Sequence, residues 1–373
     1  MESQTLAPLS RLDRLYLERA YELAARGIGN TAPNPPVGAV VVRDGCVVGE
    51  GYHHRAGAPH AETNALAQAG DAARSATLYI SLEPCAVAGR VPACAPILAE
   101  AGIARVVCGT GDPNPRNAGR GIAYLRAHGV GVDIAGDERA RELIAIFAGS
   151  VASARSFVAL KMAMSLDGAI TSRQGVQTWL TSDAVRAYVR ELRVAYDAVM
   201  VGAGTVRVDD PQLTVRPARR RVRPFVRVVA CETEPVAASS RIFEPVEGYA
   251  PTVVLAPAGM RAAYAELRDV ATVLFVGSEG DLRLDLVAAM QALRANDIFS
   301  VVCEGGPTLG ARLIAAGVVD AFYWAVAPIL LGGPEAVPVL AGVDFAALRP
   351  RLRIESTRRV GDDVVITGSL SHV

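Results

Sequence analysis

The sequence predicts two α/β domains in tandem. At 373 residues the chain exceeds the size that one hydrophobic core usually serves, so two domains are expected. Apolar runs of strand length alternate with helical segments in both halves, and Gly and Pro separate them, which favours sheets covered by helices. The alternation restarts near Phe157. We therefore expect one domain over residues 1–150 and a second over residues 155–373.

The first domain is expected to open with a helix that Ser10 caps and that ends near Gly27. Four apolar residues follow helical spacing along it: Leu12, Leu15, Ala20 and Leu23. Two apolar runs joined by Asp44-Gly45 predict a β-hairpin over residues 37–52. The remaining elements are a helix from residue 60, a strand at 76–81, a helix at 92–102, a strand at 105–110 and a helix at 137–150.

The second domain is expected to begin with a strand at 157–163, followed by a tight turn at 165–168. Ser182 can cap the next helix, which runs to residue 196, and a buried strand follows at 197–202. The further elements are strands near 226–230, 252–256 and 272–276, a helix near 284–295, and a strand and helix within 299–317.

Composition and charge exclude several classes of protein. Lys and Arg number 38 and Asp and Glu also 38, so no net positive charge favours nucleic acid, and the basic run at 216–223 is assigned to a loop. The N-terminus lacks the apolar core of a signal peptide, and no apolar run reaches 18 residues, so neither export nor a membrane span is expected. A cytoplasmic protein keeps its thiols reduced, so we expect no disulfide between Cys85 and Cys94.

A zinc site is predicted from one histidine and two cysteines. His60 lies at the start of a predicted helix, Cys85 follows a strand, and Cys94 lies near the start of the next helix. Strand ends and helix starts meet at one edge of an α/β sheet, so these side chains can converge there. One imidazole and two thiolates leave a tetrahedral zinc ion with a fourth position open to water, as in a catalytic site.

Glu62 is the candidate general acid/base beside that site. It projects from a different side of the helix than His60, which suits proton transfer between water and a leaving amine better than metal ligation. The alternative is that Cys85 and Cys94 are small core residues and His60 is a helix cap. The combination of H-x-E upstream and Glu83-Pro84 before the first cysteine favours zinc, whereas Cys46, Cys108, Cys231 and Cys303 are predicted to be core residues of strands.

These residues resemble the zinc-dependent cytidine and nucleobase deaminases, although their usual P-C-x-x-C is replaced here by C-x₈-C. The longer spacing is similar to the deaminase half of the bifunctional riboflavin-biosynthesis deaminase–reductase family over residues 11–150. The matching motifs are TAPNPPVG (31–38), GYHHRAGAPHAE (51–62), LEPC (82–85) and DPNP (112–115). The resemblance implies a three-layer α/β/α fold, zinc on His60, Cys85 and Cys94, proton donation by Glu62, and substrate contacts from Asn34 and His53.

The loop between the two cysteines departs from that family. The family usually has C-S-H-H/Y-G-R/K-T-P-P-C, but this chain reads CAVAGRVPAC, so the histidines are replaced by apolar residues while Arg90 is kept. An inactive or repurposed deaminase domain beside a working reductase is therefore an alternative hypothesis.

The second domain contains candidate nucleotide-binding turns. Glu304-Gly305-Gly306-Pro307-Thr308 ends a buried strand and begins a helix, so a phosphate can approach free backbone N–H groups there. Gly202-Ala203-Gly204 is interpreted as a strand-to-loop turn, and Asp209-Asp210-Pro211 as a polar loop. Taken singly, each of these turns has an ordinary structural explanation.

Together they resemble the reductase of the riboflavin pathway, a relative of dihydrofolate reductase. The matching motifs are KMAMSLDG (161–168), WLTS (179–182), DAVMVGAGTVRVDDPQLTVR (197–216), EGGPTL (304–309) and PILLGG (328–333). The resemblance implies NADP contacts from Ala163, Trp179, Thr205, Asp209, Gly306, Pro307, Thr308, Leu309, Gly310, Ala311 and Arg312. It implies substrate contacts from Lys161, Gln177, Arg193, Leu213, Arg216 and Glu304, with Arg193 and Arg216 on a ribose phosphate.

The leading hypothesis is a two-step enzyme with Zn²⁺ and NADPH as cofactors. It would deaminate a phosphoribosylaminopyrimidinone and then reduce the ribosyl chain. A zinc-stabilised binding or regulatory protein is a non-enzymatic alternative, but it gives Glu62 no role. A tRNA or nucleoside deaminase is disfavoured by C-x₈-C, the neutral charge and the second domain. The expected partner is the small-molecule substrate, with neither nucleic acid nor membrane, and the chain is expected to form a homo-oligomer, a dimer or tetramer.

Overall fold

The computed structural model describes residues 9–216 and 221–371. It divides into two compact units, Met1–Ala152 and Ser153–Val373, each described here by itself. Residues 217–220 of the basic run at 216–223 lie outside the described residues. Among the described residues, no helix combines the length and the apolar character that a membrane crossing needs.

The N-terminal unit is built on a five-stranded mixed sheet with the order β2-β1-β3-β4-β5. Its strands are β1 (Gly38–Arg43), β2 (Cys46–Tyr52), β3 (Thr77–Leu82), β4 (Arg105–Thr110) and β5 (Gly131–Ile134). The hairpin predicted at 37–52 is confirmed, since β1 pairs antiparallel with β2 around Asp44 and Gly45, both at positive φ. β3, β4 and β5 run parallel, so their carboxyl ends share one edge.

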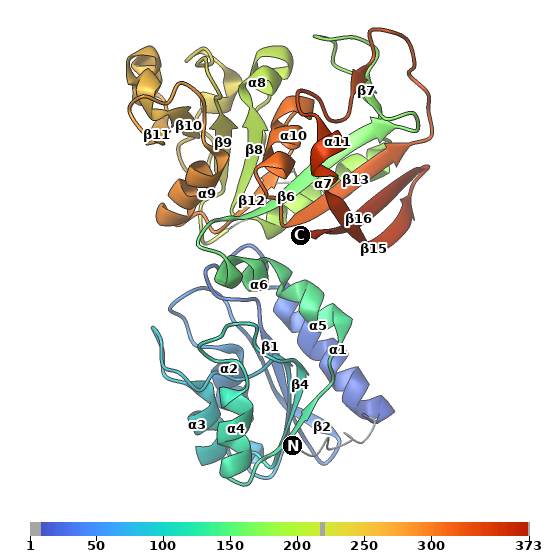
Figure 1. Cartoon of the computed structure of the whole chain (residues 1–373). Helices are drawn as coiled ribbons and strands as arrows, with labels where there is room; N and C mark the ends of the chain where they lie inside the picture. The colour runs from blue at the N-terminus through green and yellow to red at the C-terminus, as the bar shows by residue number, and fades with distance from the viewer. Residues whose placement is uncertain (1–8, 217–220, 372–373) are drawn as a thin grey trace. The chain divides into compact units, whose positions relative to one another are not determined.

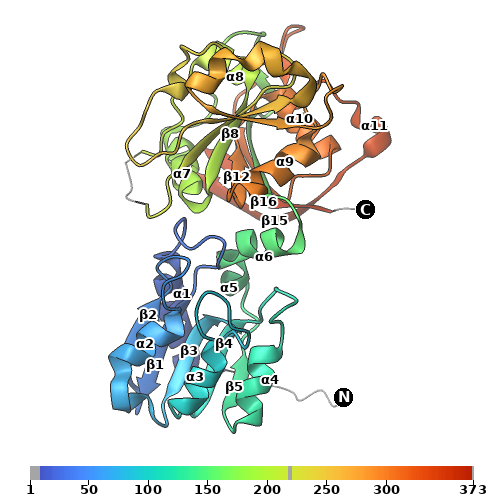
Figure 2. The same ribbon diagram turned by 90° about the vertical axis from the view of Figure 1, so that its left-hand side faces the viewer.

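Helices cover both faces of this sheet, which confirms the α/β/α layering. One core layer lies under α1 (Arg11–Ala25) and α5 (Glu138–Leu143). The other lies under α2 (Ala61–Ala69), α3 (Cys94–Glu100) and α4 (Arg120–Ala127). The short 3-10 turn η1 (Gly70–Ala73) follows α2. Figures 1 and 2 show the two groups of helices on opposite sides of the strands.

The predicted apolar face of α1 is partly wrong. Ser10 caps the helix as expected, in a reciprocal capping box with Asp13. Leu12 and Leu15, however, are 59% and 61% exposed. Asp13 faces inward instead, because its carboxylate accepts hydrogen bonds from Tyr79 and Arg105.

The helix predicted at 137–150 is two helices, α5 and α6 (Ala145–Ala152). The helical backbone is interrupted at Ile144, where φ is −105° and ψ is 8°. Ile144 is buried, so this interruption keeps its side chain in the core. Cys46, predicted to be a core residue, is exposed at the start of β2.

The C-terminal unit is built on a nine-stranded sheet with the order β11-β10-β9-β8-β12-β6-β13-β16-β15. The seven strands from β11 to β13 are parallel, and β16 and β15 add an antiparallel hairpin. The strands are β6 (Phe157–Ser165), β8 (Ala198–Gly202), β9 (Val226–Ala230), β10 (Val253–Pro257), β11 (Thr272–Val276), β12 (Ser300–Cys303), β13 (Ala321–Ala327), β15 (Arg351–Val360) and β16 (Asp363–Ser371). The first six of these strands were predicted from the sequence, and the last three were not.

Helices also lie on both faces of the larger sheet. α7 (Asp183–Ala195), capped by Ser182 as predicted, packs on one face, and α9 (Leu286–Ala295) and α10 (Pro307–Ala315) pack on the other (Figure 2). The predicted turn at 202–204 is instead the start of a short helix, α8 (Ala203–Asp209). The smaller elements are β7 (Ala169–Thr171) paired with β14 (Val337–Pro338), the 3-10 turns η2 (Arg241–Phe243), η3 (Ala258–Tyr264) and η4 (Glu266–Asp269), and α11 (Phe345–Leu348).

Candidate functional site

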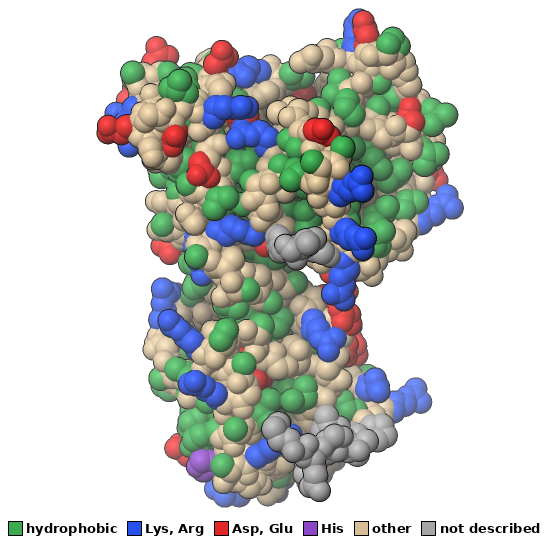
Figure 3. Space-filling view, in the orientation of Figure 1, with side chains coloured by type: hydrophobic (Ala, Val, Ile, Leu, Met, Phe, Trp, Pro, Cys, Tyr) green, Lys and Arg blue, Asp and Glu red, His purple; other side chains and the backbone are tan. Residues whose placement is uncertain are grey.

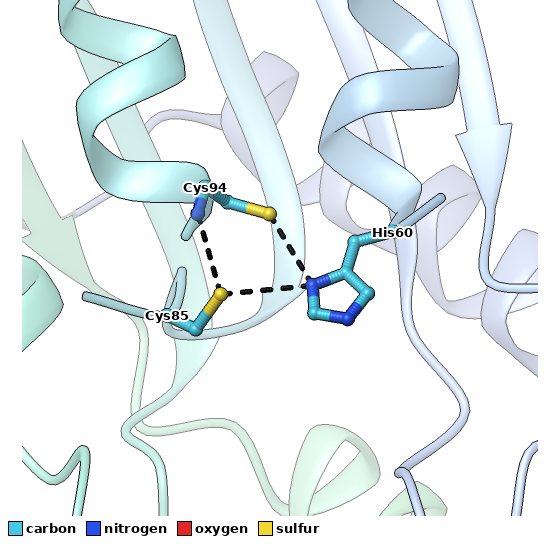
Figure 4. A group of neighbouring side chains, drawn as sticks. All are labelled: His60, Cys85 and Cys94. Atoms are coloured by element: carbon cyan, nitrogen blue, oxygen red, sulfur yellow. Dashed lines mark hydrogen bonds between the residues drawn. The ribbon is translucent and has the colours of Figure 1, made fainter. Parts of the chain in front are cut away.

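Three predicted metal ligands meet at the carboxyl edge of the N-terminal sheet. His60 is the N-cap residue of α2, Cys94 is the first residue of α3, and Cys85 follows β3. The Nδ1 atom of His60 lies 3.6 Å from Cys85 Sγ and 3.3 Å from Cys94 Sγ. Figure 4 shows the three side chains pointing toward one another from separate elements.

The geometry of these donors fits zinc. All three donor atoms lie within 4.8 Å of one another. Zinc bonds of about 2.0 Å to nitrogen and about 2.3 Å to sulfur, at tetrahedral angles, put the nitrogen and each sulfur about 3.5 Å apart. The observed separations agree with that value. Three protein ligands leave the fourth position of a tetrahedral ion open.

Cys85 is prepared to bind a cation as a thiolate. Its pKa is lowered because Cys94 hydrogen-bonds its sulfur, and His60 adds a further hydrogen bond; the same contact with Cys85 raises the pKa of Cys94. The backbone N–H of Cys94 also donates to Cys85 Sγ, at 3.3 Å. Only the thiolate form of cysteine binds zinc, so the lowered pKa favours metal binding at Cys85.

Glu62 lies beside the three ligands in the first turn of α2. Its side chain is buried, and burial raises the pKa of Glu62 to about 7, with the charge of Cys85 acting in the same direction. Its carboxyl group also hydrogen-bonds the Cys94 thiol. A carboxyl group with a pKa close to neutrality can both accept and donate a proton, which is what general acid/base catalysis requires.

Asn34 and His53 also lie beside the group formed by His60, Cys85 and Cys94. Nδ1 of His53 lies 3.1 Å from the carbonyl oxygen of Pro59, and Nε2 lies 3.1 Å from Asn34 Nδ2. Burial lowers the pKa of His53, which favours the neutral ring. With Nδ1–H donating to the carbonyl, Nε2 accepts from Asn34. The His53 ring meets the ring of His60 edge-on, with the two centroids 5.1 Å apart.

Glu83 holds the backbone around the site in place, a role that was not predicted from the sequence. Its carboxylate accepts hydrogen bonds from four backbone N–H groups, those of Asp112, Gly119, Gly121 and Ile122. This satisfies the first turn of α4 and joins it to the segment that carries Cys85. The only signal in the sequence was its place directly before Pro84-Cys85.

The loop between the two cysteines is anchored at its start. The Ala86 N–H donates to Asn117 Oδ1 at 2.8 Å, and Asn117 Nδ2 donates to Asp112 at 3.0 Å. Val87 is 44% exposed, and Arg90 is exposed as well. The replaced histidine positions therefore lie on an exposed loop, and the zinc ligands converge without them.

The C-terminal unit contains a cavity of about 1130 Å³ at the carboxyl ends of β6, β12, β8 and β9. Fourteen of the predicted cofactor and substrate residues line it: Lys161, Ala163, Gln177, Trp179, Arg193, Thr205, Asp209, Leu213, Arg216, Glu304, Gly306, Pro307, Thr308 and Leu309. Gly310, Ala311 and Arg312 are not part of this lining. Gly310 faces Met162 instead, and Arg312 lies against Glu232.

The first turn of α10 lies at the cavity and offers an anion-binding helix end. Gly306 is the N-cap residue and Pro307 occupies the first turn, so the free N–H groups of the helix face the cavity. A Cβ atom built on Gly306 would meet nothing nearer than Thr205 Oγ1, at 3.7 Å. Gly306 therefore leaves its backbone open to the cavity at this helix end.

A buried charge cluster lies at one end of the cavity. The guanidinium of Arg193 donates to both carboxylate oxygens of Glu304 and to the carbonyl of Thr214. Burial would raise the pKa of Glu304, but Arg193 outweighs it and the pKa is lowered. Burial lowers the pKa of Lys161, while Glu304 opposes that shift.

The two arginines predicted to hold a phosphate differ in their environments. Arg193 is 15% exposed and is already engaged by Glu304. Arg216 is exposed on the cavity wall, where Nε donates to Thr214 Oγ1 at 2.9 Å and Nη2 to Gln212 Oε1 at 3.2 Å. Of the two, Arg216 therefore presents the more accessible guanidinium to the cavity.

Known protein families match both units of the chain. The family described as "RibD C-terminal domain" matches residues 156–366, and "Cytidine and deoxycytidylate deaminase zinc-binding region" matches residues 10–110. The riboflavin biosynthesis protein RibD of Escherichia coli (strain K12) is 37% identical, covering 95% of this chain and 98% of that protein. RibD of Aquifex aeolicus (strain VF5) is 36% identical, covering 96% and 98%.

Solved structures also match nearly the whole chain. Acinetobacter baumannii RibD (form 1) superposes with a TM-score of 0.81 at 33% identity, covering 97% of this chain and 99% of that one. A Thermotoga maritima diaminohydroxyphosphoribosylaminopyrimidine deaminase/5-amino-6-(5-phosphoribosylamino)uracil reductase has the same TM-score and identity, with 96% and 99% coverage.

Proposed function

The chain belongs to the RibD family of riboflavin-biosynthesis proteins. On that premise we propose which residues carry out deamination and which carry out reduction. It is a bifunctional enzyme, a zinc-dependent deaminase and an NADPH-dependent reductase, that acts on small molecules. We assign deamination to residues 1–150 and reduction to residues 155–373. The convergence of His60, Cys85 and Cys94 beside Glu62 is the observation that carries the first assignment.

In the deaminase domain, His60, Cys85 and Cys94 would hold zinc, and the bound ion would make a water molecule nucleophilic near neutral pH. Glu62 carries a proton from water to the leaving amine, so that ammonia departs and a carbonyl oxygen takes its place. Asn34 and the neutral His53, joined by a hydrogen bond, orient the pyrimidine ring. The proposed substrate is a phosphoribosylaminopyrimidinone, and the name of the Thermotoga relative specifies a diaminohydroxyphosphoribosylaminopyrimidine deaminase.

In the reductase domain, the cavity holds both the deaminated substrate and the cofactor. NADPH supplies the reducing equivalent for conversion of the ribosyl group to a ribityl chain. The first turn of α10, with Thr205, Asp209, Ala163 and Trp179, binds the cofactor. The substrate-binding residues are Lys161, Gln177, Arg193, Leu213, Arg216 and Glu304. Of these, Arg216 binds the ribose phosphate while Arg193 orients Glu304.

The alternative of an inactive deaminase domain is not favoured. The altered residues 86–88 belong to the exposed loop between the cysteines, whereas the zinc ligands, Glu62, Asn34 and His53 are all present and adjacent. Separate assays of the two half-reactions test the assignment. The full chain should release ammonia from the aminopyrimidinone without any nicotinamide nucleotide, and it should reduce the deaminated compound only when NADPH is added. Reduction without ammonia release would support the alternative.

Arg216→Lys should raise the KM for the phosphorylated substrate by roughly tenfold, because an ammonium cannot form the two parallel hydrogen bonds of a guanidinium with a phosphate. NADPH affinity should be nearly unchanged. Steady-state kinetics with each substrate varied in turn measure both quantities. Arg353→Lys, at an exposed position of β15 outside the cavity, is the matched control. If NADPH affinity alone weakens, the substrate and cofactor ends of the cavity have been interchanged.

We also propose a cellular compartment and an oligomeric state for the enzyme. We assign the enzyme to the cytoplasm because Cys85 and Cys94 must stay reduced to bind zinc. Positive and negative side chains are interspersed over the face in Figure 3, in keeping with a net charge of zero, which supports a protein that binds no nucleic acid. We also propose that the chain forms a homo-oligomer, either a dimer or a tetramer. Light scattering measures the molar mass of the assembly and tests this.

A further inference from the structure

The reductase cavity extends along four neighbouring strands, and its two ends differ. β6, β12, β8 and β9 stand in that order in the sheet. Lys161 of β6 and Glu304 after β12 form the end assigned to substrate, and α10 begins directly after β12. At the other end, residues 232–234 follow β9 and α8 follows β8. A dinucleotide with its diphosphate at α10 and its nicotinamide near Lys161 therefore carries its adenosine toward the end of β9.

Arg207 lies at this adenosine end. It is one turn after Ala203 in α8, so both residues share a helix face, and both line the cavity (α8 is labelled in Figure 1). Long helical side chains point back toward the helix N-terminus, which brings the guanidinium toward the cavity. Its Nη2 atom donates to the carbonyl oxygens of Glu234 and Pro235, each at 3.1 Å. These bonds hold Arg207 against the segment that follows β9.

The guanidinium of Arg207 has N–H groups that are available to a ligand. Its side chain is 45% exposed. Within residues 9–216 and 221–371, its Nε and Nη1 atoms have no hydrogen-bond acceptor on the protein. Each of these free N–H groups can donate a charge-assisted hydrogen bond to a phosphate oxygen, and the guanidinium keeps its full positive charge beside the cavity.

The nearby carboxylates do not cancel this charge. Glu232 is matched by Arg312, whose Nη1 atom lies 2.5 Å from Glu232 Oε1, and more weakly by Arg283 at 4.0 Å. Glu234 is 77% exposed and stands 3.7 Å from Arg207, a separation and exposure at which an ion pair contributes little. An anionic ligand can therefore displace Glu234 from Arg207 at small cost.

We propose that Arg207 binds the adenosine 2′-phosphate and is the residue that makes this reductase select NADPH over NADH. NADH carries a neutral hydroxyl group at that position, so it gains nothing from the guanidinium. Glu234 opposes the phosphate by charge repulsion and moderates the preference. The inference rests on the reductase function proposed above and adds the residue that distinguishes the two nucleotides.

Arg241 is the competing cation on the cavity wall. Its backbone N–H donates to Asp210 Oδ1 at 2.9 Å, which ties it to the loop that carries Leu213 and Arg216. Leu213 and Arg216 belong to the substrate-binding set, whereas Asp209, directly before Asp210, is assigned to the cofactor. Arg241 is therefore the alternative cation that the experiment must distinguish from Arg207.

Direct binding to the full-length chain tests the proposal. Isothermal titration with NADPH and NADH, and with 2′,5′-ADP and 5′-AMP to isolate the adenosine end, gives four dissociation constants. Arg207→Leu should raise the Kd of NADPH and of 2′,5′-ADP by about 10- to 100-fold, the loss expected for hydrogen bonds to a charged group. The Kd values of NADH and 5′-AMP should hardly change. Arg207→Lys should give a smaller loss, and Glu234→Gln should tighten NADPH but not NADH.

Arg190→Leu is the matched control, because Arg190 is also an exposed helical arginine but lies outside the cavity lining. Thermal unfolding of each variant checks that the domain is folded. Equal weakening of NADPH and NADH by Arg207→Leu, or no change in either, would overturn the proposal, as would selective loss of NADPH in Arg241→Leu. A wild-type chain that binds neither nucleotide would instead reject the proposed reductase function.

Discussion

Cys85→Ser is expected to remove the zinc and with it the deaminase reaction, while reduction of the deaminated substrate continues. A serine hydroxyl stays protonated near neutral pH and is a poor zinc ligand, whereas Cys85 is held as a thiolate by Cys94 and His60. His60 and Cys94 alone make an incomplete site. Metal analysis should fall from about one zinc per chain to almost none. The second half-reaction should persist because its cavity lies in the other unit.

Cys46→Ser provides the control for that experiment. Cys46 belongs to the same unit, but its thiol is exposed and outside the ligand cluster, so zinc and both activities should be retained. Undiminished zinc in Cys85→Ser, or wild-type protein without zinc, would contradict the assignment of the site.

The metal site could be predicted because its residues sit at the ends of strongly patterned elements. His60 and Cys94 begin helices and Cys85 follows a strand, and parallel α/β topology brings such ends to one edge. Local sequence was therefore enough to anticipate the cluster. The same reasoning placed the first turn of α10 at the cavity, since a strand that ends in Gly-Gly-Pro leads directly into that helix.

Interactions between residues far apart in sequence were not predictable in this way. Glu83 accepts four hydrogen bonds from a segment that begins 29 residues later, and no periodicity marks such a contact. Arg193 and Glu304 are 111 residues apart and were assigned to the substrate separately, whereas the structure pairs them with each other. The burial of Leu12 and Leu15 was wrongly predicted for the same reason. Helical spacing alone could not reveal that Asp13 binds Tyr79 and Arg105 and so faces the core in their place.

Glu62→Gln should separate catalysis from metal binding. Glutamine has nearly the shape of glutamate but cannot carry a proton from water to the leaving amine. Deamination should therefore fall by at least about 100-fold, the contribution typical of a positioned acid/base. Zinc should remain at about one per chain, because Glu62 lies outside the three-residue ligand cluster. Metal analysis and an ammonia-release assay on the same preparation measure the two quantities.

Glu100→Gln is the matched control, since Glu100 is exposed at the end of α3 in the same unit and loses the same charge. It should deaminate like the wild type. Reduction of pre-deaminated substrate should proceed normally in both variants, because Lys161, Glu304 and the first turn of α10 are untouched. Loss of zinc from Glu62→Gln would make Glu62 a ligand rather than a proton carrier. Equal loss of deamination and reduction would mean that the two activities are not divided between the two units.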